Sequence, residues 1–512
     1  MESDDVCTTD SCDEDRLQKP NIIILLADDM GYGDLSCYGH SSQEWNEIDR
    51  MAAEGLRFTQ FYSADSMCSP ARAGLLTGRL PIRSGIVGGR RVFVDYDKGG
   101  LPKEEMTLAE MLKSAGYLTG MTGKWHLGIN AVNNSDGTHL PHMHGFDVVG
   151  LNLPMSVLWT CDTSGYFQPD GPENSQCFLY RGQKLIQQPI QFQTLTEDMV
   201  TDWKSFLDQS QSGKTRQPFF YYFSFPHVHT ALWAAKDFKG KSQRGLYGDN
   251  LNEMAWAVGQ VLDSLKAANI DKETLVLFMS DHGPHKEMCI YGGSTGGLKG
   301  GKSNSFEGGF RIPFIAWMPG TVPAGAASPA ILSTLDLIPT FHKWILQRNL
   351  PENITFDGID VIDYLLGKRL DPALNISQSR PLFFYCNQHL MAVRYRQYKI
   401  HFKTSPYFSD SQVKDDCVEG VPKGDWYVSQ LCLLKDLVEQ NPPLVYDLHA
   451  DPREMYSLDV IGNTELHLMV KEVERIVESH KNGIAEVPNQ LGKYDPKLIP
   501  CCNYPKCECN DK

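Results

Sequence analysis

Apolar residues along this chain gather in short unbroken runs, each bounded by polar or turn-forming residues. The runs over residues 21–26, 219–224 and 274–279 are rich in β-branched, leucine and aromatic side chains. Runs of this length and composition are typical of strands that are buried on both faces. Residues 117–125 form a further candidate strand, because they follow Gly116, a typical end to a helix.

Between these runs the apolar residues recur at helical spacing. We expect helices over three stretches, residues 104–115, 194–207 and 254–267. Strands that alternate with helices favour parallel pairing, because the helix returns the chain to the same edge of the sheet. The pattern therefore predicts an α/β fold with a large, mixed but mostly parallel sheet flanked by helices.

The pattern changes near residue 370, where Gly367-Lys368-Arg369 and Asp371-Pro372 interrupt it. Beyond this point, residues 381–385 and 391–403 have the pattern of paired antiparallel strands, and residues 466–481 that of a helix. We therefore divide the chain into an acidic N-terminal tail (1–19), a larger domain (20–370) and a smaller α+β domain (371–512) that ends in a cysteine-rich tail.

Composition narrows the class of protein. The chain has 48 basic and 63 acidic residues, a formal net charge of −15, which argues against a nucleic-acid-binding surface. Its 14 cysteines and three glycosylation sequons, at Asn133, Asn353 and Asn375, favour an oxidising, secretory compartment. No apolar run reaches the roughly 20 residues that a membrane helix requires, so we expect no membrane span.

Four of the cysteines lie at the C-terminal end, within residues 501–509. Cys501 and Cys502 are adjacent and no histidine lies nearby, so disulfides are favoured over a zinc site. The pairing cannot be derived from the sequence. We take a Cys161–Cys177 bond and pairs within the terminal group as guesses.

Acidic residues follow two of the predicted buried strands. Asp28 and Asp29 come directly after the first strand, and Asp281 after the strand over 274–279. Side chains at the carboxyl ends of parallel strands converge, and converging acids need a cation to remain ionised. A hard divalent ion, calcium or magnesium, fits such a site; the alternative is that the acidic pair caps a helix or turn.

Cys68 precedes Pro70 and a helix-like segment that contains Arg72. A cysteine at a helix start beside an arginine is a candidate nucleophile, since both features favour the thiolate. The competing interpretation is a structural or disulfide-bonded cysteine, which is the default in a secreted protein.

Basic groups and imidazoles follow two other strands. Lys124 and His126 end the strand over 117–125, and His227 and His229 follow the strand over 219–224, where alternation would point both rings to one side. The rival role for this histidine pair is zinc binding. A glycine-rich basic loop, residues 296–302, lacks the spacing of a P-loop. Together these groups suit a tetrahedral oxyanion held against a metal, which indicates ester hydrolysis at sulfur or phosphorus.

Five segments in a fixed order resemble the type I sulfatase family. Cys68-Ser69-Pro70-Ala71-Arg72, followed by Leu76-Thr77-Gly78-Arg79, matches the Cys-x-Pro-x-Arg and Thr-Gly-Arg signature of that family. The other matching segments are residues 26–34, 120–128 and 306–311. The resemblance runs from about Pro20 to the terminal cysteines and is strongest to the animal arylsulfatase A-like branch. It implies an alkaline-phosphatase-like fold, with 20–370 as the catalytic domain.

The resemblance also implies a mechanism. Cys68 would be oxidised to formylglycine by a formylglycine-generating enzyme, and one hydroxyl of the hydrated aldehyde would attack the sulfate sulfur. The family pattern implies one calcium ion and assigns further roles at matching positions. The metal site would comprise Asp28, Asp29, Cys68, Asp281 and His282. Catalytic roles would fall to Cys68, Arg72, His126 and His229, and the sulfate would be bound by Lys124, Ser156, His229 and Lys302.

Two positions depart from the family pattern. His282 stands where close relatives often have Asn or Gln, although calcium prefers oxygen ligands. Steryl-sulfatase-like relatives carry a hydrophobic hairpin between the positions of Ser156 and His229, and no such apolar run is present here. Membrane insertion is therefore not expected.

We thus expect an arylsulfatase-type hydrolase of the secretory pathway, lysosomal or extracellular. Its substrate would be a sulfated small molecule, glycan or lipid, and the sequence leaves a homo-oligomer open. One alternative is a phosphodiesterase or phosphonate hydrolase of the same superfamily. Another is a catalytically idle matrix protein that binds sulfated glycans. The paired acids and basic residues argue against the idle scaffold, because clustered charges stabilise a fold poorly.

Overall fold

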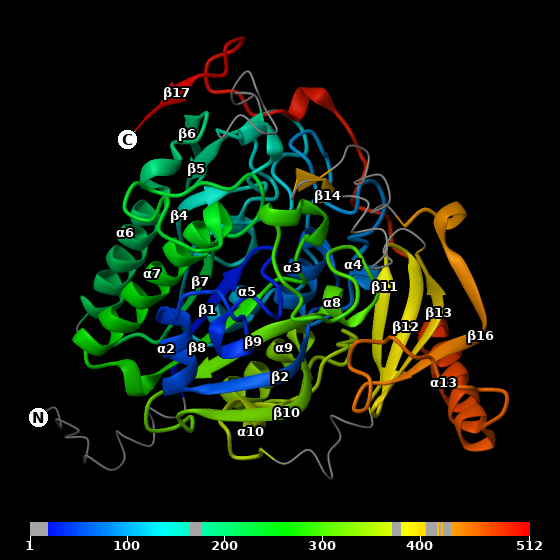
Figure 1. Ribbon diagram of the computed structural model, residues 1–512. Coiled ribbons are helices and arrows are strands. Elements are labelled where there is room, and N and C mark those ends of the chain that lie inside the picture. Colours follow the sequence, from blue (N-terminus) through cyan, green and yellow to red (C-terminus); the bar gives the residue numbers. More distant parts are fainter. Residues whose placement is uncertain are drawn as a thin grey trace, which may run out of the picture.

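The computed structural model describes residues 19–163, 176–213, 216–370, 380–405, 417–418, 421–422 and 432–511. The predicted acidic tail lies outside these residues except for Lys19, and so does Asn375. Figure 1 shows one large layered body with a smaller sheet at its side.

A mixed eleven-stranded sheet forms the centre of the described part of the chain. Its strand order is β10-β2-β9-β8-β1-β7-β3-β4-β5-β6-β17. The strands are β1 (Asn21–Ala27), β2 (Leu56–Tyr62), β3 (Leu118–Lys124), β4 (Val148–Leu153), β5 (Leu179–Arg181), β6 (Lys184–Gln188), β7 (Phe219–Ser224), β8 (Thr274–Ser280), β9 (Arg311–Trp317), β10 (Ala326–Ser333) and β17 (Cys509–Asn510). The five central strands from β8 to β4 are all parallel. The predicted fold class is confirmed.

The alternation of β1 explains why its sequence is apolar at every position after Asn21. Ile22, Ile24 and Leu26 belong to one hydrophobic core, whereas Ile23 and Leu25 belong to a second core on the opposite face. A strand buried on both faces must be apolar at every position, which is what the run over 21–26 indicates.

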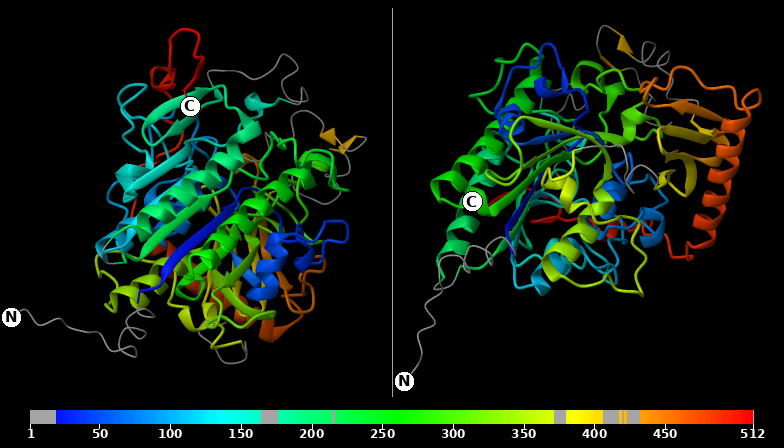
Figure 2. Two further views of the ribbon diagram at one scale, coloured as in Figure 1. Left: turned by 90° about the vertical axis from the view of Figure 1, so that its left-hand side faces the viewer. Right: turned by 90° about the horizontal axis from the view of Figure 1, so that it is seen from below.

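Helices cover both faces of the large sheet. One face is covered by α2 (Glu47–Glu54), α6 (Phe192–Gln211) and α7 (Gly245–Ala267), and the left view of Figure 2 shows the two long helices lying across it. The other face packs against α3 (Cys68–Thr77), α5 (Leu108–Ser114), α9 (Leu337–Phe341) and α10 (Ile362–Leu365). The predicted helices over 104–115, 194–207 and 254–267 are confirmed as α5, α6 and α7, with shifted ends.

The smaller sheet has the strand order β11-β12-β13-β16, all antiparallel. Its strands are β11 (Leu382–Cys386), β12 (His389–Tyr395), β13 (Tyr398–Thr404) and β16 (Val438–Asp447), and α13 (Thr464–Asn482) packs against it. The stretch 391–403 forms two strands rather than one, because the chain reverses at Arg396, whose φ of 57° is left-handed. The domain boundary near residue 370 stays a prediction.

Five disulfides link described cysteines. Three of them match the sequence-based guesses, namely Cys161–Cys177, Cys501–Cys507 and Cys502–Cys509. The other two are Cys289–Cys417 and Cys386–Cys432. Among the described residues, only Cys37 and Cys68 are free thiols. No helix in the described ranges is long and apolar enough to cross a bilayer.

Candidate active site

The predicted site residues lie at the carboxyl ends of neighbouring parallel strands. Asp28 and Asp29 follow β1 directly, Asp281 and His282 follow β8, and Lys124 is the last residue of β3. Because β8, β1, β7 and β3 are adjacent and parallel, these strand ends meet at one edge of the sheet.

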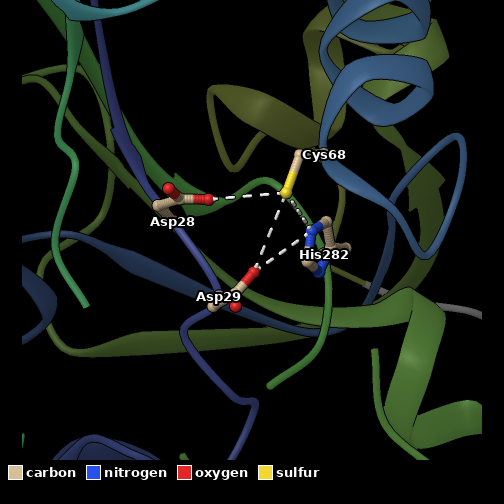
Figure 3. Close-up of side chains that lie close together, drawn as sticks. All are labelled: Asp28, Asp29, Cys68 and His282. Carbon is tan, nitrogen blue, oxygen red and sulfur yellow. Dashed lines mark hydrogen bonds and ion pairs between the residues drawn. The ribbon is translucent and has the colours of Figure 1, made fainter. Parts of the chain in front are cut away.

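Cys68 reaches this edge from the opposite direction, as the first residue of α3. Its side chain is buried, and its Sγ lies 3.3 Å from Nε2 of His282, 3.9 Å from Oδ1 of Asp28 and 4.0 Å from Oδ1 of Asp29. One ligand atom of each of these four residues lies within 4.8 Å of the other three, and Figure 3 shows all four pointing toward one another. The helix start adds backbone N–H groups that favour negative charge at Cys68.

Each of the three buried carboxylates has its own buried cation. The nitrogen–oxygen distances are 2.6, 2.7 and 2.9 Å for the pairs Asp28–Lys124, Asp29–Lys302 and Asp281–Arg72, respectively. All six side chains are at most 5% exposed. The cluster therefore balances three negative charges with three positive ones, counting carboxylates, ammonium groups and the guanidinium only.

These pairs set the protonation of the acids. Burial raises the pKa of Asp28, but the charges of Lys124, His229 and Arg72 outweigh it and hold the pKa well below its usual range. Lys302 does the same for Asp29, against burial, so that both carboxylates stay ionised.

Asp281 differs from the two leading aspartates. Its Oδ1 accepts hydrogen bonds from the backbone amides of Asp29 (3.1 Å) and His282 (3.0 Å), while Nε of Arg72 donates to its Oδ2 (3.1 Å). Burial raises the pKa of this carboxyl above its ordinary value. Asp281 thus lies beside the four converging residues and orients two of them through their backbone.

His282 presents its Nε2 to the cluster. Its Nδ1 lies 2.8 Å from the carbonyl oxygen of Gly283, so Nδ1–H donates there and leaves Nε2 facing Cys68 and Asp29. Burial lowers the pKa of His282, but the charge of Asp281 and the neighbouring Cys68 sulfur outweigh burial and raise the pKa to about 9. At neutral pH this imidazole therefore carries a proton, which a cation bound at Nε2 would have to replace.

The donor set fits a hard cation. Two ionised carboxylates face the centre, a third is adjacent, and the position of the Cys68 sulfur would carry an oxygen after conversion to formylglycine. Such an oxygen-rich set is typical of calcium, with the His282 nitrogen as the one departure.

His126 and His229 are buried and neutral. Nε2 of His126 donates to the carbonyl of Phe93 (3.0 Å), and its buried Nδ1 has no hydrogen-bond partner among the described residues. Burial lowers its pKa well below the ordinary value. In His229, Nδ1 donates to the carbonyl of Val157 (3.0 Å), which turns Nε2 toward Oδ2 of Asp29 at 3.8 Å. Burial, together with the charge of Lys302, lowers the pKa of His229 to about 4.

Ser156 joins the same site from the segment after β4. Its Oγ donates to Oδ2 of Asp28 over 3.3 Å. The structure therefore brings the predicted metal and sulfate-binding residues and Arg72 to one location, and His126 follows two residues after Lys124 of this cluster.

The histidine pair after β7 separates, contrary to the expectation from alternation. His229 faces the acids, whereas Nε2 of His227 contacts Oγ1 of Thr196 (3.2 Å) and its ring packs on Trp233. β7 ends at Ser224, so the period of a strand does not apply to residues 227–229.

The sequence-based reasoning missed His285. This residue is 4% exposed, and its Nδ1 lies 3.9 Å from Oδ2 of Asp29, the oxygen that Lys302 also contacts. Its position four residues after Asp281, in the segment that leaves β8, was the available signal.

None of the glycosylation sequons that the structure describes contributes a residue to this buried cluster. Asn133 and Asn353 are exposed, as an attached glycan requires.

A family model for sulfatases matches residues 20–346. The chain belongs to the sulfatase family. A second model, for the C-terminal region of aryl-sulfatases, matches residues 377–509 of this sulfatase.

Known sulfatases are similar over nearly the whole length. The arylsulfatase of Hemicentrotus pulcherrimus is 43% identical over 96% of this chain and 87% of that protein. Human arylsulfatase A is 36% identical over 95% of this chain and 93% of that protein. Among solved structures, the PsFucS1 sulfatase from Pseudoalteromonas sp. superposes with a TM-score of 0.75 at 26% identity, covering 93% of this chain and 94% of that one. This sulfatase is thus a sulfuric ester hydrolase of the arylsulfatase type.

Proposed function

We propose that this sulfatase cleaves sulfate esters with a formylglycine hydrate made from Cys68, at a site that holds one calcium ion. The observation that supports this most is the position of Cys68: a free, buried sulfur at a helix start, within 4.0 Å of two ionised carboxylates. Every other described cysteine except Cys37 is in a disulfide. A formylglycine-generating enzyme would act before folding closes this site.

The chain's own residues divide the work around the sulfur. Bound calcium would supply positive charge that polarises the sulfate group and favours ionisation of the nucleophile. His126 has the free, unprotonated Nδ1 that can accept a proton from the second hydroxyl of the hydrate, because its Nε2–H is held by Phe93. Arg72 pairs with Asp281 (2.9 Å) and also donates to Oγ of Ser224 (2.6 Å), and these two contacts fix the position of the guanidinium.

The sulfate clamp is proposed to consist of Lys124, Lys302, His229 and Ser156. Each of them contacts Asp28 or Asp29. Lys124 and Lys302 would turn their ammonium groups to the sulfate oxygens. Of the two candidate acids, Lys302 is the one that can donate a proton to the leaving oxygen: burial lowers its pKa, but the charge of Asp29 outweighs burial and raises it. Neutral His229 holds its only N–H on Val157 and presents Nε2 as an acceptor.

The enzyme is proposed to mature in the secretory pathway and to act in the lysosome or outside the cell, with glycans on Asn133, Asn353 and Asn375. The five described disulfides support this compartment. The substrate class we propose is a sulfated small molecule, glycan or lipid.

The deciding experiment compares nitrophenyl sulfate with nitrophenyl phosphate at equal concentrations. We expect the purified enzyme to hydrolyse the sulfate ester with a kcat/KM at least about 10²-fold higher, and Cys68→Ala to abolish this activity while keeping the fold. Faster cleavage of the phosphate ester would assign the protein to the phosphoester branch. Full activity in Cys68→Ala would refute the proposed nucleophile.

A further inference from the structure

The segment that carries Lys302 is held by the smaller domain. Residues 299–307 lead from the glycine-rich loop to α8 (Glu307–Phe310), and the backbone amide of Gly308 closes the loop on the carbonyl of Lys299 (2.7 Å). Lys302 lies in its middle and places its Nζ 2.7 Å from Oδ2 of Asp29. Figure 1 shows α8 beside β11, at the junction of the two sheets.

One residue from beyond β16, Glu454, contacts both ends of this loop. Its carboxylate accepts a hydrogen bond from the backbone amide of Glu307 (2.6 Å) at the C-terminal end. Its carbonyl oxygen accepts another from Nζ of Lys299 (3.3 Å) at the N-terminal end. Glu454 is fully buried and has a left-handed φ of 53°, which places its carbonyl and its carboxylate toward the same loop.

Strand β13 of the smaller sheet fixes Glu454 in turn. His401 contacts the second carboxylate oxygen at 2.7 Å, and Nζ of Lys399 lies 3.7 Å from the same oxygen. Lys399 also donates to Glu307 (3.0 Å), so the two glutamates share one ammonium group. All these side chains are fully buried, and buried charged groups of this kind hold a fixed geometry because moving one leaves its partner unpaired.

The loop has a third contact with the smaller domain. The Cys386–Cys432 disulfide lies against the carbonyl oxygen of Ser303, with Sγ of Cys386 at 3.4 Å. The amide of Ser303 donates to the carbonyl of Ser66 (2.7 Å), two residues before Cys68. The smaller domain therefore reaches both the lysine and the nucleophile through the same short loop.

From this geometry we propose that Glu454 is a positioning residue that sets the location of Lys302 in the sulfate clamp. The inference rests on the proposed role of Lys302. Glu454 itself touches no reacting group; it acts by fixing the two ends of residues 299–307. The smaller domain is then a working part of the active site.

The test is a double-mutant cycle on kcat/KM for nitrophenyl sulfate, measured well below the unfolding temperature of every variant. The variants are Glu454→Ala, Lys302→Ala and the double mutant. We expect Glu454→Ala to lower kcat/KM by about 10- to 100-fold. In the Lys302→Ala background the same substitution should cause little further loss, because the effects of substituting two residues that act through one another do not add. Glu454→Gln keeps an acceptor for the amide of Glu307 and should recover most of the activity.

A matched control separates positioning from loss of stability. Arg380 forms a buried ion pair with Asp336 (2.6 Å between Nη2 and Oδ2) just before β11, away from the loop. Arg380→Met should lower the unfolding temperature but leave kcat/KM near the wild-type value. If Glu454→Ala does not fold, Lys299→Met replaces it in the cycle, since Lys299 is only half-buried and its loss frees one end of the loop.

The outcomes distinguish the two proposals. The positioning role would be overturned by additive losses of kcat/KM in the cycle. It would also be overturned if folded Glu454→Ala, or its substitute Lys299→Met, had the wild-type kcat/KM. Wild-type activity in Lys302→Ala would instead overturn the proposed clamp.

Discussion

Lys124 should compete with the proposed metal ion for the carboxylate of Asp28, and this competition is measurable. Nζ of Lys124 lies 2.7 and 2.6 Å from the two oxygens of Asp28, and both side chains are fully buried. Replacing Lys124 by methionine keeps the apolar stem but leaves Asp28 with only Arg72, at 3.4 Å, as a close cation. Breaking a buried ion pair from one side costs about 3–5 kcal/mol.

The expected change in unfolding temperature follows from the size of the chain. An unfolding entropy of about 2 cal/mol/K per residue gives roughly 1 kcal/mol/K for 512 residues, so the metal-free variant should unfold about 3–5 °C below wild type. With calcium present the metal pairs with Asp28 instead. The difference should then shrink to less than about half, because the variant gains more from the metal.

The assay is thermal unfolding of wild type and Lys124→Met in EDTA and in excess calcium. Arg380→Met is the matched control, since Arg380 pairs with the fully buried Asp336 (2.6 Å between Nη2 and Oδ2) outside the metal cluster. Its shift should be the same in both buffers. The competition would be refuted if Lys124→Met lowered the unfolding temperature equally with and without calcium. It would also be refuted if calcium changed the unfolding temperature of none of the three proteins.

Three further predictions concern the same groups. His282→Asn should retain metal and activity, because an amide oxygen suits calcium at least as well as the imidazole; loss of both in a folded variant, by metal analysis and ester hydrolysis, would contradict this. Inorganic sulfate should tighten calcium binding, and calcium should tighten sulfate binding by the same factor, as measured by calorimetry. The reason is that the three ion pairs already neutralise the three carboxylates, so the charge of a bound calcium ion stays uncompensated until an anion binds. Binding of the two ions with independent affinities would disprove the coupling. Burial raises the pKa of Glu307, but the charges of Lys399 and Arg394 outweigh burial and lower the pKa to about 2 from its usual 4.5. The ionised Glu307 therefore stabilises the folded protein above pH 4.5, and this contribution is lost as the pH falls toward 2. Glu307→Gln should therefore flatten the acid limb of stability against pH, and an unchanged limb in denaturant titrations would rule this contribution out.

The sequence predicts the centre of the fold better than its periphery. The runs that became β1, β7 and β8 are apolar at every position except at their ends, because both faces of these strands are buried. β2 carries polar residues among its apolar ones and was not recognised as a strand. The reversal between β12 and β13 was missed because it uses Arg396, without the glycine or asparagine that usually marks such a turn.

The site, too, could be predicted only in part from the sequence. Asp28, Asp29 and Asp281 could be placed together because strand ends converge in a parallel sheet. The ion pairs that neutralise them could not be derived, since they depend on the loop that brings Lys302 to the end of β1 and on the packing of α3, which brings Arg72 to the end of β8. Glu454 gave no local signal at all: its function arises from a contact with Glu307 across 147 residues of chain.

The central claim is that Cys68 is the precursor of formylglycine, and mass spectrometry of the tryptic peptide 58–72 tests it most directly. In active protein made in its natural secretory pathway, this peptide should be lighter than its cysteine form, because oxygen replaces sulfur and two hydrogens are lost. It should also react with a carbonyl reagent. An unmodified thiol at residue 68 in protein that hydrolyses sulfate esters at full rate would contradict the account.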